Sequence, residues 1–451
     1  MQPPLRPRAA LVLAALLVGC GADPAVRTAR QGDFPALGRD LDARAGAGKL
    51  GADLLRDVSR AVLEHDAERY DGDEGVRRTS GLASCARPLE GTLDRLAKRS
   101  DEIGAAAAAV LVDAELEAKD AFTDAHKDDA LPRWRAVATR GLYDRSEGAL
   151  RLARSRDDDR WVRLGAVEAA GDAGCAGDFP LLLDAARHDP EVIVRVAAVR
   201  AIDRLAPRLA EGTARADLVD RLRDLHRDGD ESLRGAVARA WGSPALFPVG
   251  GERELLAVVG NEHGHAAVEA ASALMLAGSP EGELALVRFS NEGDSEVRAH
   301  AIRLLDATRP AHFDALQGLI KEPDAQKEGP VDDPRARELA AETVLRAPAS
   351  RLDQTDAGKR LRVAATDALK KLSSRADRLG ADAALALADA GDGSMRERLQ
   401  KELAIASPMR PRVAAALVRL GFGADARALL ADADLDVRDA VACQVLGGSR
   451  R

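Results

Sequence analysis

The sequence predicts an all-α protein, built as an α-solenoid of stacked helical hairpins. Hydrophobic residues make up 46% of the 451 residues, whereas aromatic residues make up only 3%. The core must therefore consist of small aliphatic side chains on closely packed helices, and the abundant alanine has the strongest helix propensity. In addition, an apolar stripe with helical period recurs about every 30 residues, which is typical of repeat proteins.

The first twenty residues have the features of an export signal. Arg6 and Arg8 precede an apolar stretch, residues 9–18, which is too short to cross a bilayer because a spanning helix needs about 20 residues. The stretch ends in Leu17-Val18-Gly19-Cys20, which resembles the lipobox of bacterial lipoproteins. The resemblance implies that Cys20 is lipidated and becomes the first residue of the mature chain. The alternative is an ordinary secretory signal with an incidental cysteine, and either interpretation places the mature chain outside the cytoplasm.

These features predict four segments and a class of partner. We expect a lipoprotein signal peptide over 1–19, a tether over 20–32, an N-terminal helical region or diverged repeats over 33–127, and the solenoid over 128–451. No later apolar run approaches membrane-spanning length, so acyl chains are the anchor that we expect. Loss of Arg6 and Arg8 takes the formal net charge from −8 to −10, which disfavours nucleic acid and anionic lipid surfaces as partners. A protein partner with a basic patch is expected instead, and no small-molecule substrate.

The segment that follows the tether is less regular but also helical by pattern. Apolar side chains there recur at helical spacing, and an alanine run has strong helix propensity. Whether this segment begins the solenoid or caps it stays open at this point. The stripes are Leu54, Leu55, Val58, Val62 and Leu63, then Leu89, Leu93 and Leu96, and the alanine run covers 105–109.

The repeat is carried by a short motif, in which an aliphatic residue and an arginine are followed by a small residue. In one copy, Val194, Ala198, Ala201, Ile202 and Leu205 fall on a single face of a helix. Shorter apolar segments between the motifs supply the first helix of each hairpin, at 180–186, 218–225, 255–259, 284–289 and 424–431. Clear copies of the motif begin at Val162, Val194, Val297, Leu361 and Val437, weaker ones surround Arg135, Arg234, Val268, Arg337 and Arg412, and a degenerate one lies near Ala381, Ala384 and Leu385.

An acidic residue stands four residues ahead of the motif arginine and is expected to cap the second helix of each hairpin. A carboxylate at that place accepts hydrogen bonds from free backbone N–H groups, and proline suits the first helical position. The expected caps are Asp159, Asp230, Asp294 and Asp434, with Glu191 in the copy that begins Asp189-Pro190.

This unit of two helices, an acidic cap and a Val-Arg pair resembles HEAT repeats, particularly the short kind found in phycobilin lyases. The resemblance covers roughly residues 128–446 and implies a superhelix in which each repeat contacts only its neighbours. It also implies that each motif arginine ties one repeat to the next through the aspartate of the turn. A basic stripe that captures an acidic ligand is the alternative role for these arginines.

The residues that could carry chemistry do not form a convincing site. HEAT-type iron oxygenases hold their metal with His-Glu pairs, and this sequence contains no His-Glu dipeptide. His263 and His265 stand close together, but a solvated turn is the preferred interpretation. Asp432, Asp434 and Asp436 alternate as in a calcium loop, yet Val437 stands where that loop needs glycine, and a repeat turn fits better. The segment 46–49 lacks the first glycine and the final Ser or Thr of a phosphate loop.

Three cysteines remain after Cys20, so at least one of them stays free or pairs between chains in an oxidising compartment. Cys443 lies among apolar residues near the end of the last helix, where a small apolar role is expected. Cys85 and Cys175 lie at helix edges or loops, and a disulfide between these two is one alternative.

We therefore expect a non-catalytic scaffold of the cell envelope, lipid-anchored through Cys20, that binds a protein partner on the concave surface lined by the second helices. No cofactor and no metal site are predicted. A chromophore or small-ligand handling protein like the phycobilin lyases is the alternative from another class, and the export signal disfavours it. A third hypothesis is a solenoid that organises envelope components without a fixed partner. The sequence leaves open which membrane receives the anchor.

Overall fold

The computed structural model describes residues 23–69, 72–114, 116, 118–321, 333–421 and 423–447. The regular secondary structure of these residues is helical and includes no strand, which confirms the predicted all-α class. The chain forms two compact units. We call residues 97–395 the solenoid unit, and the described residues of 1–96 and 396–451 together the terminal unit.

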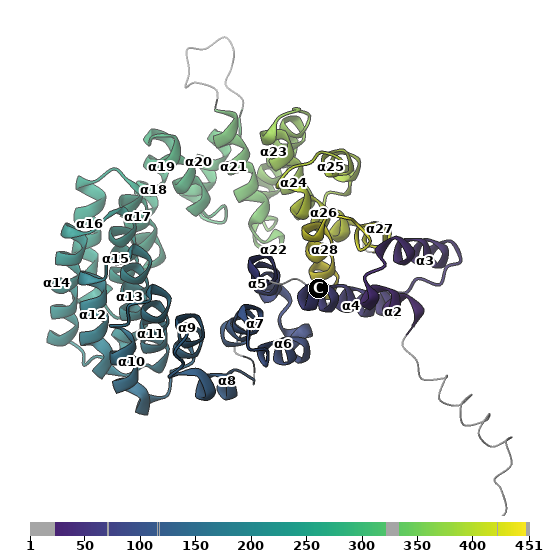
Figure 1. Cartoon of the computed structure of the whole chain (residues 1–451). Coiled ribbons are helices and arrows are strands. Elements are labelled where there is room, and N and C mark those ends of the chain that lie inside the picture. Colours follow the sequence, from purple (N-terminus) through teal and green to yellow (C-terminus); the bar gives the residue numbers. More distant parts are fainter. Residues whose placement is uncertain are drawn as a thin grey trace, which may run out of the picture. The chain divides into compact units, whose positions relative to one another are not determined.

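The solenoid unit begins with α7 and continues as consecutive helical hairpins, as predicted (Figure 1). The second helices of successive hairpins pack against one another to form one row, and the first helices form another row. The first helices are α8 (Ala118–His126), α10 (Gly148–Arg154), α12 (Phe179–His188), α14 (Thr213–Asp228), α16 (Gly251–Asn261), α18 (Pro280–Glu292) and α20 (Pro310–Ile320). The second helices are α9 (Pro132–Arg140), α11 (Arg160–Ala173), α13 (Val192–Leu205), α15 (Glu231–Trp241), α17 (His265–Leu276), α19 (Ser295–Leu304) and α21 (Pro334–Arg346), and α7 spans Glu102–Asp113.

The core of the solenoid unit lies between the two rows and runs without a break from α11 to α24 (Arg378–Asp389), whereas α7, α8 and α9 bury a separate apolar cluster. The predicted stripe of α13 is fully buried there, from Val194 to Leu205. Small residues let the helices approach closely. A Cβ atom added to Gly165 on α11 would lie 2.9 Å from the carbonyl oxygen of Ala136 on α9, so glycine is needed at that contact.

One pair of predicted copies has a different arrangement from the one expected. The copy around Arg362 lies on α23 (Asp356–Ser373), and the degenerate copy near Ala381 lies on α24 (Arg378–Asp389). Both helices pack against each other and against α21, with the short α22 (Ala349–Leu352) before them. They are the two helices of one hairpin, and not the second helices of two separate repeats. The motif misleads here because the apolar stripe of a first helix has the same period as that of a second helix.

The terminal unit combines helices from both ends of the chain, and its first helix corrects the predicted tether. Residues 24–31 are helical because Asp23 caps α2, Pro24 occupies its first turn and Gly32 ends it in the left-handed conformation. The N-terminal helices are α2 (Pro24–Gln31), α3 (Phe34–Gly46), α4 (Ala52–Arg69), α5 (Gly72–Gly81) and α6 (Glu90–Ala97), with 3-10 turns η2 (Leu82–Cys85) and η3 (Arg87–Leu89). The C-terminal helices are α25 (Arg396–Leu403), α26 (Arg410–Leu420), α27 (Ala426–Leu429) and α28 (Leu435–Gly447).

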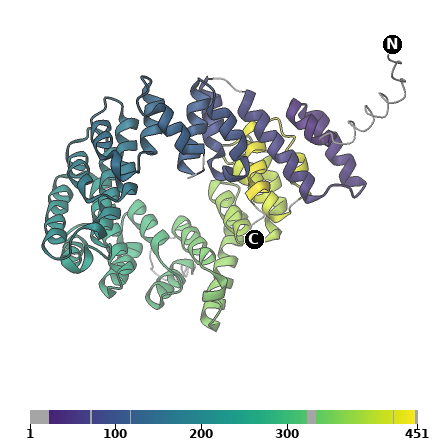
Figure 2. The ribbon, with the colours of Figure 1, turned by 90° about the horizontal axis from the view of Figure 1, so that it is seen from below.

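Helices from the two ends of the chain lie side by side in this unit (Figure 2). α28 packs against α4 and η2 as well as against α26, and α27 packs against α3. The expectation that each repeat contacts only its sequence neighbours is therefore wrong for the last repeat. Its exposed stripe would otherwise face water, and the N-terminal helices cover it. The expected boundary between residues 127 and 128 does not coincide with a unit boundary, since α8 and α9 both belong to the solenoid unit.

Candidate functional site

The motif arginines form a ladder that joins successive hairpins of the solenoid unit. Five of these guanidinium groups donate to a carboxylate in the turn of the following hairpin, which confirms for them the structural role that the HEAT resemblance implies. The distances are 2.7 Å from Arg135 to Asp157, 2.7 Å from Arg163 to Asp189 and 2.6 Å from Arg195 to Asp230, and Arg234 and Arg298 pair in the same way with Glu262 and Asp333.

Three of these arginines, Arg135, Arg163 and Arg195, also donate to backbone carbonyl groups of their own turns. Arg163, for example, donates to the carbonyl oxygens of Asp157 and Asp158, both at 3.0 Å. One side chain thus fixes its own turn and the next hairpin together. Arg362 does not bond to the turn of the following hairpin, because it lies on a first helix. It donates instead to Asp353 and to the carbonyl oxygen of Ala347.

Four of the five predicted caps are confirmed, among them Asp434, which accepts a hydrogen bond from the N–H group of Asp436 at 3.0 Å, and the fifth is corrected. Asp159, Asp230 and Asp294 accept hydrogen bonds from backbone N–H groups of the first turn of α11, α15 and α19. Glu191 stands at the cap position of α13, but its side chain makes no capping hydrogen bond, and Pro190 lies before the cap. Asp189 accepts the hydrogen bond from the N–H group of Glu191 instead, at 2.9 Å, because a shorter acidic side chain two residues back can close the turn.

The ladder continues into the terminal unit, where the last arginine has a distant partner. Arg410, and not the predicted Arg412, bonds Asp434 at 2.7 Å. Arg438 on α28 pairs with Asp66 on α4 at 3.0 Å. Both side chains of that pair are almost fully buried, at 4% and 1% exposure. The guanidinium also lies over the ring of Phe34, 3.9 Å from its centroid.

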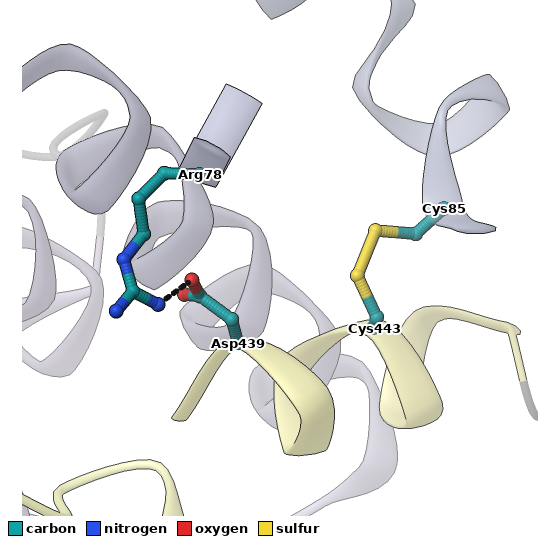
Figure 3. The surroundings of a disulfide bond; sticks show 4 residues. All are labelled: Arg78, Cys85, Asp439 and Cys443. Carbon is teal, nitrogen blue, oxygen red and sulfur yellow. Dashed lines mark hydrogen bonds and ion pairs between the residues drawn. A yellow bond between two sulfur atoms is a disulfide. The ribbon is translucent and has the colours of Figure 1, made fainter. Parts of the chain in front are cut away.

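Beside this pair, a disulfide joins Cys85 on η2 to Cys443 on α28 (Figure 3). The expected apolar role of Cys443 and the alternative disulfide between Cys85 and Cys175 are both wrong, because α28 packs on η2 and leaves Cys175 free. Asp439, one turn before Cys443, accepts a hydrogen bond from Arg78 at 2.7 Å. Burial and the neighbouring charge of Asp66 raise the pKa of Asp439 to about 7 against the opposing effect of Arg78.

The candidate binding site is a groove on the face of the solenoid unit formed by its second helices. It has a volume of about 720 Å³, and we call it the second-helix groove. Val192 and Ile193 at the start of α13 are 41% and 48% exposed beside it. Trp161 is 47% exposed and precedes Arg163 on α11 as Ile193 precedes Arg195 on α13, so it extends the same apolar edge. The lining residues are Leu164, Glu168, Val192, Ile193, Val196, Ala197, Arg200, Glu231, Ser232, Gly235, Arg239, His265, Glu269 and His300.

The carboxylates of the second-helix groove all have partners within the protein. Glu168 pairs with Arg140 at 3.1 Å, and Glu231 accepts a hydrogen bond from the backbone N–H group of Ala266 at 2.9 Å.

Glu269 is the most constrained of these carboxylates. It bonds Arg239 at 2.9 Å and His300 at 3.0 Å. Burial is the largest influence on the pKa of Glu269 and raises it, but hydrogen bonds from His300 and Arg239 outweigh burial and hold the pKa below its ordinary value. Glu269 therefore stays ionised at neutral pH, and its charge is balanced by its neighbours.

The two arginines of the groove differ from each other in whether they have a partner. Arg239 is paired with Glu269, whereas Arg200 is exposed, and within the described residues no ion pair or hydrogen bond engages it. A second cavity, of about 520 Å³, lies between the first helices α12 and α14, and Arg221 in its lining is likewise exposed without an ion pair in the described chain.

The other residues singled out in the sequence do not form a site. Cys20 lies outside the described residues. His265 reaches the second-helix groove, where its ring centroid lies 5.1 Å from that of His300. Asp432 and Asp434 stabilise the repeat turn, as predicted. Each carboxylate accepts one hydrogen bond from a backbone N–H group and one from the guanidinium of Arg410. The described residues hold no group of three or more His, Cys, Asp or Glu side chains suited to a metal ion. None of the described helices has the length and apolar character of a membrane span.

The sequence predicted a binding surface on the second helices, but not which of their residues line the candidate groove. Ile193, Val196, Ala197 and Arg200 follow the spacing i, i+3, i+4 and i+7 on α13, opposite the buried stripe that begins at Val194. An apolar residue on the exposed face of an otherwise amphipathic helix was the signal that could have identified them.

The order and packing of its helices define this chain as an α-solenoid of stacked helical hairpins. Neither a scan against protein-family models nor a search of curated proteins found a match. Similar solved structures include YibA of E. coli (18% identity over 63% of this chain and 97% of that one, TM-score 0.36). Human deoxyhypusine hydroxylase in complex with glycerol has 18% identity over 66% of this chain and 99% of that one, with a TM-score of 0.25. Importin beta has 14% identity over 90% of this chain and 57% of that one, with a TM-score of 0.30. Likeness at this level carries no argument about activity or partners.

Proposed function

We propose that this chain is a non-catalytic scaffold of the bacterial cell envelope, exported and anchored by a lipid at Cys20, and that it binds a partner protein in the second-helix groove. The observation that carries the binding role is the exposed apolar edge formed by Trp161, Val192 and Ile193 beside a groove lined with polar groups. Complete burial of an aliphatic side chain contributes about 1.5–3 kcal/mol, so covering these half-exposed residues contributes about 1 kcal/mol each. An apolar centre with a polar rim is the usual composition of a protein interface.

The export part of the proposal is supported by the signal at residues 1–20 and by the disulfide between Cys85 and Cys443. Structural disulfides persist in oxidising compartments such as the bacterial periplasm and the cell surface, and are rare in the cytosol.

The anchor is tested by metabolic labelling of the full chain with a fatty acid analogue. We expect label on the wild-type chain and none on Cys20→Ala, which should also leave the membrane fraction. The matched control is Cys175→Ser, which removes the free thiol and should keep both the label and the membrane location. A wild-type chain that takes up no label and stays soluble would exclude the lipid anchor.

The binding role is tested by affinity capture from native membranes, with the recovered proteins identified by mass spectrometry. Ile193→Asp on the groove should lose the captured partner, because a carboxylate replaces the apolar edge. Leu284→Asp on the first helix α18 is the control, since Leu284 is 66% exposed and lies away from the groove lining. Equal capture of the partner by both variants would exclude the groove as the binding site. Turnover of a recovered small molecule by the pure protein would exclude a non-catalytic role.

A further inference from the structure

The charges in the second-helix groove indicate what kind of segment binds there, and this inference rests on the proposed protein-binding function. The formal net charge of the whole chain is −8, which alone would favour a basic partner. The groove itself is different, because two of its carboxylates, Glu168 and Glu269, are paired with arginines of this chain. Glu231 keeps its charge and accepts a hydrogen bond from a backbone N–H group. Arg200 is left as a cation that no described residue neutralises. The charge that an incoming group meets at this point is therefore positive.

The position of Arg200 relative to the apolar edge sets a distance. Ile193 and Arg200 are seven residues apart on the same face of α13, with Val196 and Ala197 between them. At a rise of 1.5 Å per residue, their Cα atoms are separated by about 10 Å along the helix axis. Val196 and Ala197 pack against the core on one side and line the groove on the other, so the floor between the two ends is apolar and fixed.

We infer that the second-helix groove binds a segment of a partner protein in which an apolar side chain and a carboxylate lie about 10 Å apart. The apolar side chain covers Ile193 and Val196, and the carboxylate pairs with Arg200. A guanidinium recognises a carboxylate through two parallel N–H donors, which fixes the orientation of the segment as well as its charge. In a bound helix the two residues would be about seven positions apart. In an extended segment they would be about two or four positions apart, because alternate side chains of a strand point to opposite faces.

The test uses a display library of random 12-residue peptides, selected on the full chain. We expect selected peptides to share Asp or Glu at one of these two spacings from an aliphatic or aromatic residue. A synthetic peptide of the consensus should bind Arg200→Glu about tenfold more weakly, because the variant replaces an attraction with a repulsion. The same peptide with its acidic residue changed to Lys should bind Arg200→Glu more tightly than it binds the wild-type chain.

Arg221→Glu is the matched control, because Arg221 in the first-helix cavity is exposed and forms no ion pair with a described residue, and the net charge changes equally. Its affinity for the consensus peptide should stay within about twofold of wild type. Peptides without a shared acidic position, or equal weakening by both variants, would overturn the inference while leaving protein binding in place. Selection of no peptide would overturn both the inference and the proposed function. Binding of decanoate that depends on Arg200, without any selected peptide, would assign the groove to a small apolar acid and overturn both as well.

Discussion

The solenoid unit and the terminal unit use the same contact, an arginine that donates to a carboxylate of another hairpin, over very different sequence distances. In the solenoid unit the two partners are 22 to 35 residues apart. In the terminal unit, Arg438 and Asp66 are separated by 372 residues and the two cysteines by 358. The solenoid unit is thus assembled from local steps, whereas the terminal unit forms only when the two ends of the chain meet. The stability of the terminal unit should therefore depend on contacts between the two ends of the chain, and that of the solenoid unit on contacts between neighbouring hairpins. Three experiments test this difference.

The largest effect is expected from Arg438→Ala. This change leaves Asp66 buried without its partner, which should cost about 3–5 kcal/mol. Arg298→Ala removes the equivalent pair of the solenoid unit, but Arg298 and Asp333 are 27% and 31% exposed, so the loss should be about 0.2–1 kcal/mol. Chemical denaturation of the two variants measures the difference. Similar losses would mean that burial of the terminal pair does not distinguish the two units.

The disulfide should contribute only to the terminal unit. Cys443→Ser opens a covalent loop of 358 residues and should destabilise that unit by about 2–5 kcal/mol. Hydrogen exchange should show faster opening of α4 and α28 and unchanged protection of α13. Cys175→Ser is the control and should change neither region, since Cys175 forms no disulfide with a described cysteine. Loss of protection across α13 in Cys443→Ser would show that the two units unfold together.

The two units should also respond to pH through different groups. The raised pKa of Asp439, about 7, means that the folded terminal unit keeps a proton that the unfolded chain releases near pH 4. Stability from this group is therefore present at pH 4 and is lost as the pH rises to 7, by about 1–3 kcal/mol. Burial raises the pKa of Glu338 on α21 to about 7 as well, which predicts the same sign in the solenoid unit.

Protection factors from hydrogen exchange between pH 4 and pH 8 separate the two groups. Asp439→Asn should flatten the pH dependence at α28 and leave that of α21, and Glu338→Gln should do the reverse. If either variant flattens the pH dependence of protection at both α28 and α21, the two titrating groups do not act on separate units.

The comparison also explains how much of this molecule the sequence could predict. The repeat motif identified the solenoid unit because Arg163 and Arg195 each pair with a carboxylate in the next hairpin. Contacts between neighbouring hairpins recur along the sequence and therefore produce a periodic pattern. Nothing in the pattern around Cys443 or Arg438 indicates that their partners stand near residues 66 and 85, because a contact across more than 350 residues leaves no period. Arg200 was missed for another reason. Its role depends on which neighbouring charges are already neutralised, and that requires the arrangement of α11, α13, α15 and α17 in space.

The disulfide has a mechanical consequence. A force that pulls the chain apart between its first and last described residues passes from Cys85 directly to Cys443 through a covalent bond, so the residues between these two cysteines carry no tension. Non-covalent helix packing yields before a covalent bond does, and in an unbridged solenoid pulled from its ends each hairpin in turn would bear the load. In this chain the hairpins that carry the second-helix groove are outside the path of the force. If Cys20 fixes the chain to a membrane, strain along that attachment would reach the terminal unit and leave the groove unstretched.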